Sequence, residues 1–122
     1  MIVHLLLNAF EITAELARTP VEHAKGLSHR SSLPWNHGML FVFNSDTDRA
    51  FWMYETYIPL DIIFLDKDFV IVGILENMQP HDMMLRRIER PSRYALEVNA
   101  GFVRMYDIRV GQRVVEIATP LG

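Results

Sequence analysis

The chain has 122 residues, of which half are hydrophobic and 22% are charged, with a formal net charge of −3 and no cysteine. This length and composition are typical of a single globular domain over residues 1–122 and argue against disorder. Without cysteine there can be no disulfide, thiolate metal site or thiol nucleophile. The slightly acidic balance provides no general attraction for nucleic acid. We therefore expect no nucleic-acid partner. Because the sequence also lacks recognised metal-ligand spacings and glycine-rich phosphate loops, we expect no metal and no cofactor.

The chain begins with MIVHLLLNAFE, a short apolar stretch interrupted by His4. It has no basic segment before it, is too short for the apolar part of a signal peptide, and falls far below the ~20 apolar residues of a membrane span. We expect a cytoplasmic protein without a membrane span. An exported protein whose signal has been removed is the alternative.

The first predicted elements are two strands and a helix. Residues 2–7 and 10–17 form apolar and alternating patterns around Asn8-Ala9, which predict two paired strands. Thr19-Pro20-Val21-Glu22 is typical of a helix start, because Thr19 and Glu22 can form a capping box and proline fits the first helical position. Gly26 is the expected end of this helix.

The rest of the chain is predicted to be mostly strand. We expect 38–43 and 50–54 to pair through a polar loop at 44–49, and 60–65 to form a hairpin with 69–76. A long loop at 77–92, a strand at 93–99, a short helix at 101–106 and a last strand at 113–117 follow. These elements predict an α+β fold, a compact β-rich barrel-like or sandwich-like domain with one or two short helices.

Two acids lie among apolar neighbours on predicted strands. Asp61 would share a face with Ile63 and Leu65, and Glu97 would share one with Ala95 and Asn99. An unpaired carboxylate is costly to bury at either place. Either each acid is held by turn amides or by an arginine (Arg18, Arg30 or Arg49), or the two acids face one cleft as a general acid/base pair. The structural role is favoured, because ion-pair networks perturb acids as active sites do.

Aromatic residues are the second group of candidates. Four of them could form a wall for a sugar, a peptide or another flat ligand: Trp35, Trp52, Tyr54 and Tyr57. Along 51–54, Phe51 and Met53 face opposite Trp52 and Tyr54, so only one pair can fill the core. The alternative is that Trp52 packs inward while Tyr54 is half exposed.

Recognised catalytic motifs are missing. The sequence contains no His-Glu-x-x-His, Gly-x-Ser-x-Gly or glycine-rich phosphate loop. His37, at the mouth of a predicted strand, is the best candidate for proton transfer, although an ordinary loop histidine is the more common case. The methionine- and arginine-rich segment 78–93 could dock a partner; a flap over the core is the plainer interpretation.

Several segments occur in an order that resembles a known family. They are Glu15-Leu16-Ala17 with Thr19-Pro20, Gly26-Leu27 with Arg30, His37-Gly38-Met39-Leu40-Phe41-Val42-Phe43, Phe51-Trp52-Met53 with Thr56, Ile58-Pro59-Leu60-Asp61-Ile62-Ile63-Phe64, Asn77 with Pro80, and Leu96-Glu97-Val98-Asn99-Ala100-Gly101. Over 10–115 the chain closely resembles the domain of unknown function 192 family of small bacterial and archaeal domains. The resemblance implies a compact β-rich α+β domain, often exported or lipid-anchored, and implies no reaction.

The chain departs from this family pattern at two places. The family typically has Gly-Leu-Met-Phe-Arg where this chain has Gly26-Leu27-Ser28-His29-Arg30. It often has Trp-Met-Lys-Asn-Thr where this chain has Trp52-Met53-Tyr54-Glu55-Thr56. If these side chains contact a ligand in relatives, the ligand preference of this chain differs.

Our preferred hypothesis is a non-catalytic small-ligand-binding or accessory domain. Its polar-rimmed cleft would be lined by Trp52, Thr56, Asp61, Glu97 and Asn99. One alternative is a small hydrolase or lyase in which Asp61 and Glu97 act as acid and base, assisted by His37. The other is a protein-interaction module that docks through 78–93.

Overall fold

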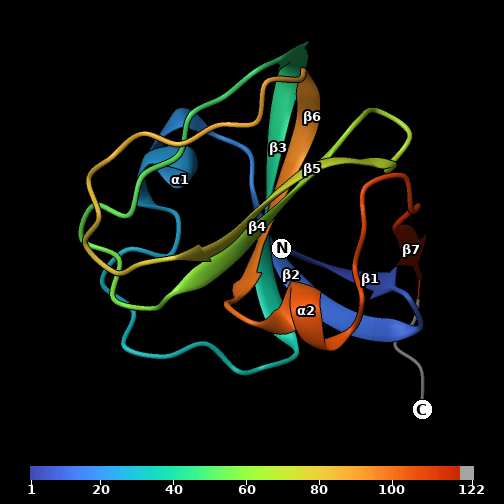
Figure 1. Cartoon of the computed structure of the whole chain (residues 1–122), viewed down its shortest axis with the longest axis horizontal. Helices are drawn as coiled ribbons and strands as arrows, with labels where there is room; N and C mark the ends of the chain where they lie inside the picture. Colours follow the sequence, from blue (N-terminus) through green and yellow to red (C-terminus); the bar gives the residue numbers. More distant parts are fainter. Residues whose placement is uncertain (119–122) are drawn as a thin grey trace.

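The computed structural model describes residues 1–118, which form seven strands and two short helices. In chain order these are β1 (Ile2–Leu7), β2 (Phe10–Ala17), α1 (Pro20–Lys25), β3 (His37–Thr47), β4 (Leu60–Leu65), β5 (Ile71–Met78), β6 (Ser92–Asn99), α2 (Phe102–Met105) and β7 (Val115–Ile117). The strands form one sheet in the order β5-β4-β6-β3-β2-β1-β7 (Figure 1). Neighbouring strands run antiparallel except β2 and β3, which run parallel.

The predicted β-rich α+β class is confirmed, and the sheet is open but strongly curled. In Figure 1, β4 and β5 cross the direction of β3 and β6 at a steep angle. The curl brings the chain before β5 against the chain before β7. There Ile71 donates its N–H to the Gln112 carbonyl at 2.8 Å, and Gly111 donates to the Ile71 carbonyl at 2.8 Å. The two ends of the sheet therefore meet at one corner, which gives the domain its barrel-like shape.

The central strands bury side chains on both faces of the sheet. One core cluster includes Ile63 and Leu96 and is covered by Phe102 of α2. The cluster on the other face, the second core, includes Ile62 and Ala95. That face is covered by the chain around α1 and by the segment between β3 and β4, which contribute Leu27, Leu33, Met53 and Ile58. The covering segments thus lie on opposite sides of one sheet, each over its own core.

The predicted pairing of 38–43 with 50–54 is wrong. β3 lies between β2 and β6, so both of its edges already have partners. The chain continues β3 as far as Thr47, where a loop was expected, and 50–54 lies outside the sheet with a single bridge from Phe51 to Arg86. Met53 packs inward while Trp52 and Tyr54 stay about half exposed, so the predicted alternation along this segment is present without a strand.

α1 begins at Pro20 with the predicted capping box. The Thr19 hydroxyl accepts a hydrogen bond from the Glu22 N–H at 3.1 Å, and the Glu22 carboxylate accepts from the Thr19 N–H at 3.0 Å and the Arg18 N–H at 2.9 Å. After Lys25 the helix ends at Gly26, whose φ of 48° favours glycine. Because α1 follows β2 directly, the cap sets how the helix lies over the second core.

Replacing Thr19 with alanine is expected to lower the free energy of unfolding by about 1 kcal/mol, because the Glu22 N–H then loses its capping acceptor. Urea denaturation of the wild type and the variant measures this difference. Thr19→Ser keeps the hydroxyl and is expected to retain most of the stability. Equal losses in the two variants would show that the methyl group, and not the cap, supports α1.

Candidate functional site

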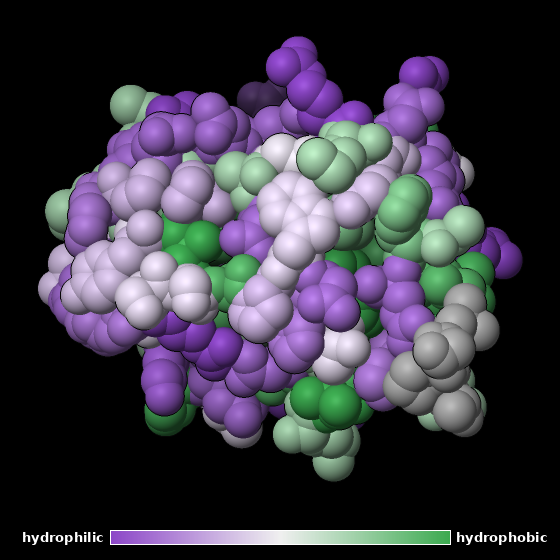
Figure 2. Space-filling view, turned by 90° about the horizontal axis from the view of Figure 1, so that it is seen from below, coloured by the Kyte–Doolittle hydropathy of each residue, from purple (hydrophilic) through white to green (hydrophobic). Residues whose placement is uncertain are grey.

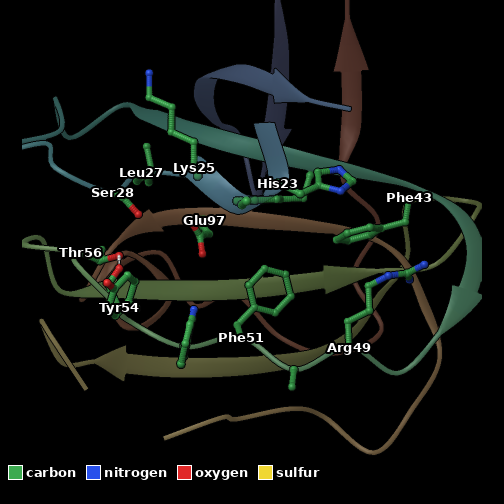
Figure 3. A pocket seen from close by; sticks show the side chains of 15 residues that line it. His23, Lys25, Leu27, Ser28, Phe43, Arg49, Phe51, Tyr54, Thr56 and Glu97 are labelled. Atoms are coloured by element: carbon green, nitrogen blue, oxygen red, sulfur yellow. Dashed lines mark hydrogen bonds between the residues drawn. The ribbon is translucent and has the colours of Figure 1, made fainter. Parts of the chain in front are cut away.

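A pocket of about 360 Å³ opens between α1 and the segment 49–56, over the sheet face that carries the second core. Its lining comes from α1 and the turn after it, from β3, from 49–56 and from β6 (Figure 3). The lining residues are His23, Ala24, Lys25, Gly26, Leu27, Ser28, Phe41, Phe43, Arg49, Ala50, Phe51, Trp52, Tyr54, Thr56 and Glu97.

Glu97 is the acid inside this pocket. Its side chain is on β6, its residue is only 6% exposed, and its neighbours across the sheet are Met39 and Ile62. Within residues 1–118 its carboxyl group makes no hydrogen bond or ion pair, and Figure 3 shows the oxygens pointing into the pocket. Burial raises the pKa of Glu97 to about 8, so the carboxyl is protonated at neutral pH.

Gly38 explains how β6 can lie so close to β3 at this point. A Cβ atom on Gly38 would stand 2.5 Å from the Glu97 carbonyl oxygen, closer than van der Waals contact allows. Glycine therefore permits the close approach of the two strands at the residue pair beside Met39 and Glu97. The backbone of the pocket floor depends on this contact.

Aromatic rings form the walls. Phe41 and Phe51 meet edge to face with centroids 5.5 Å apart, and Phe43 lies against both. Trp52 and Tyr54 stack on each other with centroids 5.2 Å apart, and they are 47% and 46% exposed. The pocket therefore combines a buried phenylalanine wall with a half-exposed stacked pair.

The basic side chains at the pocket are held by hydrogen bonds within the protein or point away from the pocket. His23 Nε2 lies 2.9 Å from the Ala17 carbonyl oxygen and 3.0 Å from that of Val42. Because both partners are acceptors, this nitrogen carries the hydrogen and donates the hydrogen bond. Arg49 donates to the Ser45 and Ser92 carbonyls, and its guanidinium carbon lies 3.8 Å from the Phe43 ring centroid. Lys25 points away from the pocket interior (Figure 3).

Three of the five predicted ligand-binding residues come together here: Trp52, Thr56 and Glu97. Thr56 is buried, and its hydroxyl donates to the Tyr54 carbonyl at 3.1 Å. The hydrogen bond holds the turn that presents Tyr54. Thr56 therefore shapes the wall and also offers its oxygen to the pocket.

Asp61 was predicted for the same cleft and lies on the opposite face of the sheet. Asp61 pairs with Val98 across β4 and β6, whereas Glu97 pairs with Ile62, so the two acids alternate to different sides. Asp61 accepts hydrogen bonds from the N–H groups of Asn77 at 2.8 Å, Gly101 at 3.1 Å and Val103 at 3.0 Å. The acid/base pair required by the hydrolase hypothesis is not formed, and Asp61 holds backbone amides instead.

Asn99 and His37 also lie outside the pocket lining. The Asn99 side chain donates to the Leu33 carbonyl at 3.0 Å and the Pro34 carbonyl at 3.2 Å, so it fixes the loop before β3. His37 begins β3 beside β2. Neither residue reaches the Glu97 carboxyl, so neither is placed to assist it.

None of the three candidate arginines pairs with Asp61 or Glu97 in the described chain. Arg30 forms a two-pronged ion pair with Glu15, which lowers the pKa of that carboxyl, mainly through the hydrogen bond. Arg49 is bound to backbone carbonyls at the pocket margin. Arg18 contributes its backbone N–H to the α1 cap.

Sequence reasoning missed the contributions of α1 and β3, chiefly His23, Phe41 and Phe43. One signal pointed to the site: Ser28 and Tyr54, at two of the positions where the chain departs from the family pattern, both line the pocket. The segment 79–86 holds the pocket segment 49–56 in place. Phe51 exchanges two backbone hydrogen bonds with Arg86, and the Met53 N–H donates to the Asp82 carbonyl.

Other kinds of site are less well supported. Residues 1–118 contain no group of three or more His, Asp or Glu side chains that could hold a metal. Over the same residues, no helix is long and apolar enough to cross a membrane. On the face shown in Figure 2, hydrophobic residues form small patches separated by hydrophilic ones.

These features define a β-rich α+β domain with an aromatic pocket and, inside it, a buried carboxyl that has no partner within residues 1–118. The chain belongs to the domain of unknown function 192 family, described as "Uncharacterized ACR, COG1430", whose model matches residues 4–116. The resemblance inferred from the motifs is thereby confirmed.

Two solved structures are similar to this chain. A "putative transcription regulator" from Sinorhizobium meliloti is 35% identical, with a TM-score of 0.88 over 94% of this chain and 92% of the other. A protein of unknown function from Novosphingobium aromaticivorans is also 35% identical, with a TM-score of 0.84 over 94% of this chain and 84% of the other. No curated protein matches the chain.

Proposed function

We propose that this domain binds a small molecule in the pocket between α1 and 49–56. The observation that carries the proposal is the Glu97 carboxyl, which is 6% exposed, points into the pocket and lacks a partner among the described residues. Buried polar groups are almost always hydrogen-bonded to protein or to water, so a carboxyl that faces a cavity without a protein partner is open to a ligand that replaces water there. Ligand pockets typically combine apolar walls with a few such polar groups.

The pocket is suited to a ring-containing ligand. Its volume of about 360 Å³ falls in the range of small-molecule sites. The Trp52–Tyr54 stack at its margin offers flat, half-exposed surfaces that a ring can cover. Glu97 supplies the polar contact that would orient the ligand. No catalytic step follows from this arrangement, because the second acid, Asp61, lies across the sheet.

A thermal-shift screen with ring-containing fragments of about 10–20 non-hydrogen atoms tests the proposal. A fragment that binds the folded state raises its stability by about 2.7 kcal/mol when present at 100 times its Kd. Trp52→Ala removes the exposed half of the wall and is expected to weaken any such fragment at least tenfold. Trp35→Phe is the matched control, because Trp35 packs on Phe102 and Tyr106 beside α2.

Two outcomes of this screen would contradict the proposal. If no fragment stabilises the wild type, or if Trp35→Phe abolishes binding as fully as Trp52→Ala does, the pocket is not the binding site. Two-dimensional amide NMR of the wild type adds a direct readout, since fragments in the pocket should shift the Glu97 amide and the Trp52 indole signals.

A further inference from the structure

We propose that the pocket selects organic ammonium ligands, with the Glu97 carboxylate as their counter-ion and the surrounding aromatic rings as their contact surface. This inference rests on the proposed small-molecule binding and adds the chemical class of the ligand. It follows from three observations. Glu97 has no partner within residues 1–118, aromatic rings line its pocket, and the basic side chains nearby form no ion pair or hydrogen bond with it.

The first observation is the contrast between the two buried acids. Asp61 is 1% exposed and accepts three backbone N–H groups, as an acid that serves the fold should. Glu97 is nearly as buried and accepts none within residues 1–118. Desolvation without compensation is costly for the fold. A cation supplied from outside would provide the missing interaction.

The second observation is the number of aromatic rings that line the pocket together with Glu97. Five aromatic side chains line the same pocket: Phe41, Phe43, Phe51, Trp52 and Tyr54. The negative faces of such rings attract ammonium groups within about 6 Å of the ring centre, and aromatic cages of this kind recognise quaternary ammonium ligands. A carboxylate at the bottom of the pocket adds the full opposite charge that rings alone lack.

The third observation concerns the other titratable groups that line the pocket with Glu97. From α1 these are His23 and Lys25, and from 49–56 they are Arg49 and Tyr54. None of them forms an ion pair or hydrogen bond with Glu97 in the described structure. Its cross-strand neighbours on β3 and β4, Met39 and Ile62, carry no charge. The carboxyl is thus open to a ligand cation.

The same groups disfavour an anionic ligand. His23 Nε2 and the Arg49 guanidinium are already held by backbone carbonyls, and Lys25 points outward. An anion in the pocket would meet Glu97 with few unoccupied donors to receive it. A neutral ring could use the aromatic walls, but it would leave Glu97 protonated and would show no strong pH dependence.

Ammonium binding must be linked to proton release from Glu97. The carboxyl has a pKa of about 8 in the free protein, so at lower pH it must lose its proton when the cation binds. The affinity for a permanent cation should therefore rise about tenfold per pH unit up to that pKa and then level off.

Amide NMR titrations with three probes test this inference: benzyltrimethylammonium, benzyl alcohol and benzoate. For the ammonium probe, the Kd from the Glu97 amide and Trp52 indole shifts is expected to fall about tenfold between pH 6 and pH 7. Binding of benzyl alcohol should be weaker by tenfold or more and independent of pH. Benzoate should not shift these signals.

Glu97→Gln is the decisive variant, because it mimics the protonated side chain and is expected to fold. It should weaken the ammonium probe at least tenfold at pH 9 and abolish the pH dependence. Glu116→Gln removes a charge from an exposed position on β7 and should leave the Kd unchanged. Its unchanged Kd would exclude a general charge effect.

The failures of the two proposals are distinguishable. If benzyl alcohol binds as tightly as the ammonium probe, or if Glu97→Gln leaves the ammonium Kd unchanged, the ammonium inference is overturned while small-molecule binding stands. If none of the probes and none of the screened fragments shifts the pocket signals, both proposals fail.

Discussion

Replacing Asp61 with asparagine is expected to lower the free energy of unfolding by about 3 kcal/mol, measured by urea denaturation at pH 7. Oδ1 of Asp61 accepts the Asn77 N–H, and Oδ2 accepts the N–H groups of Gly101 and Val103. An asparagine amide has one oxygen and one NH₂ group. Whichever way it is oriented, its NH₂ group faces a backbone donor in a site that is 1% exposed.

The control for lost charge is Asp48→Asn. Asp48 forms an exposed pair with Arg87, at 3.5 Å, and such pairs contribute little. Its replacement should change the stability by less than about 0.5 kcal/mol. Because Asp61 lies on the opposite sheet face from the pocket, Asp61→Asn should leave fragment affinity unchanged at temperatures where the variant is folded. Lost binding with unchanged stability would contradict the structural role.

Local sequence patterns were sufficient for most strands and for the start of α1. The alternation of 10–17 and the Thr19–Glu22 capping box depend only on neighbouring residues, and both appear in the structure. The same reasoning failed at 50–54. An alternating aromatic segment satisfies the pattern of a strand, but a strand also needs a free edge, and β3 has none.

The relation between Asp61 and Glu97 could not be predicted for a related reason. Alternation within each strand showed which neighbours share a face with each acid. It could not show that β4 and β6 are adjacent, or that Ile62 stands opposite Glu97. A shift of the register by one residue would have placed both acids on one face. Long-range register, and not local pattern, decided between a paired site and two separate ones.

The pocket depends on the same kind of long-range information. Its residues come from α1, β3, 49–56 and β6, which are far apart in the sequence. Trp52 and Glu97 were identified because each is an aromatic or polar residue in an apolar context, and Thr56 because it stands in a segment that resembles the family pattern. His23 was not, because its role rests on two carbonyls, those of Ala17 and Val42, that meet only in the fold.

The second large effect is expected in the pH dependence of stability. Glu97 has a pKa of about 8 in the folded protein, against an ordinary pKa of 4.5 for a glutamate side chain. Between these two values the folded state holds a proton that the unfolded state has released. Stability therefore falls as pH rises through this window. At about 1.4 kcal/mol per pKa unit, the loss from pH 4.5 to pH 8 is on the order of 4 kcal/mol.

Glu97→Gln should abolish this loss, because the amide cannot ionise. Urea denaturation at half-unit steps from pH 5 to pH 9 should show the wild type and the variant nearly equal at pH 5, with the variant several kcal/mol more stable at pH 9. Hydrogen bonds lower the pKa values of Glu15 and Asp82, so the stability that these two acids contribute is lost as the pH falls, at lower pH than this window. Both acids are present in the wild type and in the variant. The difference between the two curves thus isolates Glu97. Parallel curves over this range would mean that the carboxyl has a partner or solvent contact in solution, and the argument for an external cation would lose its basis.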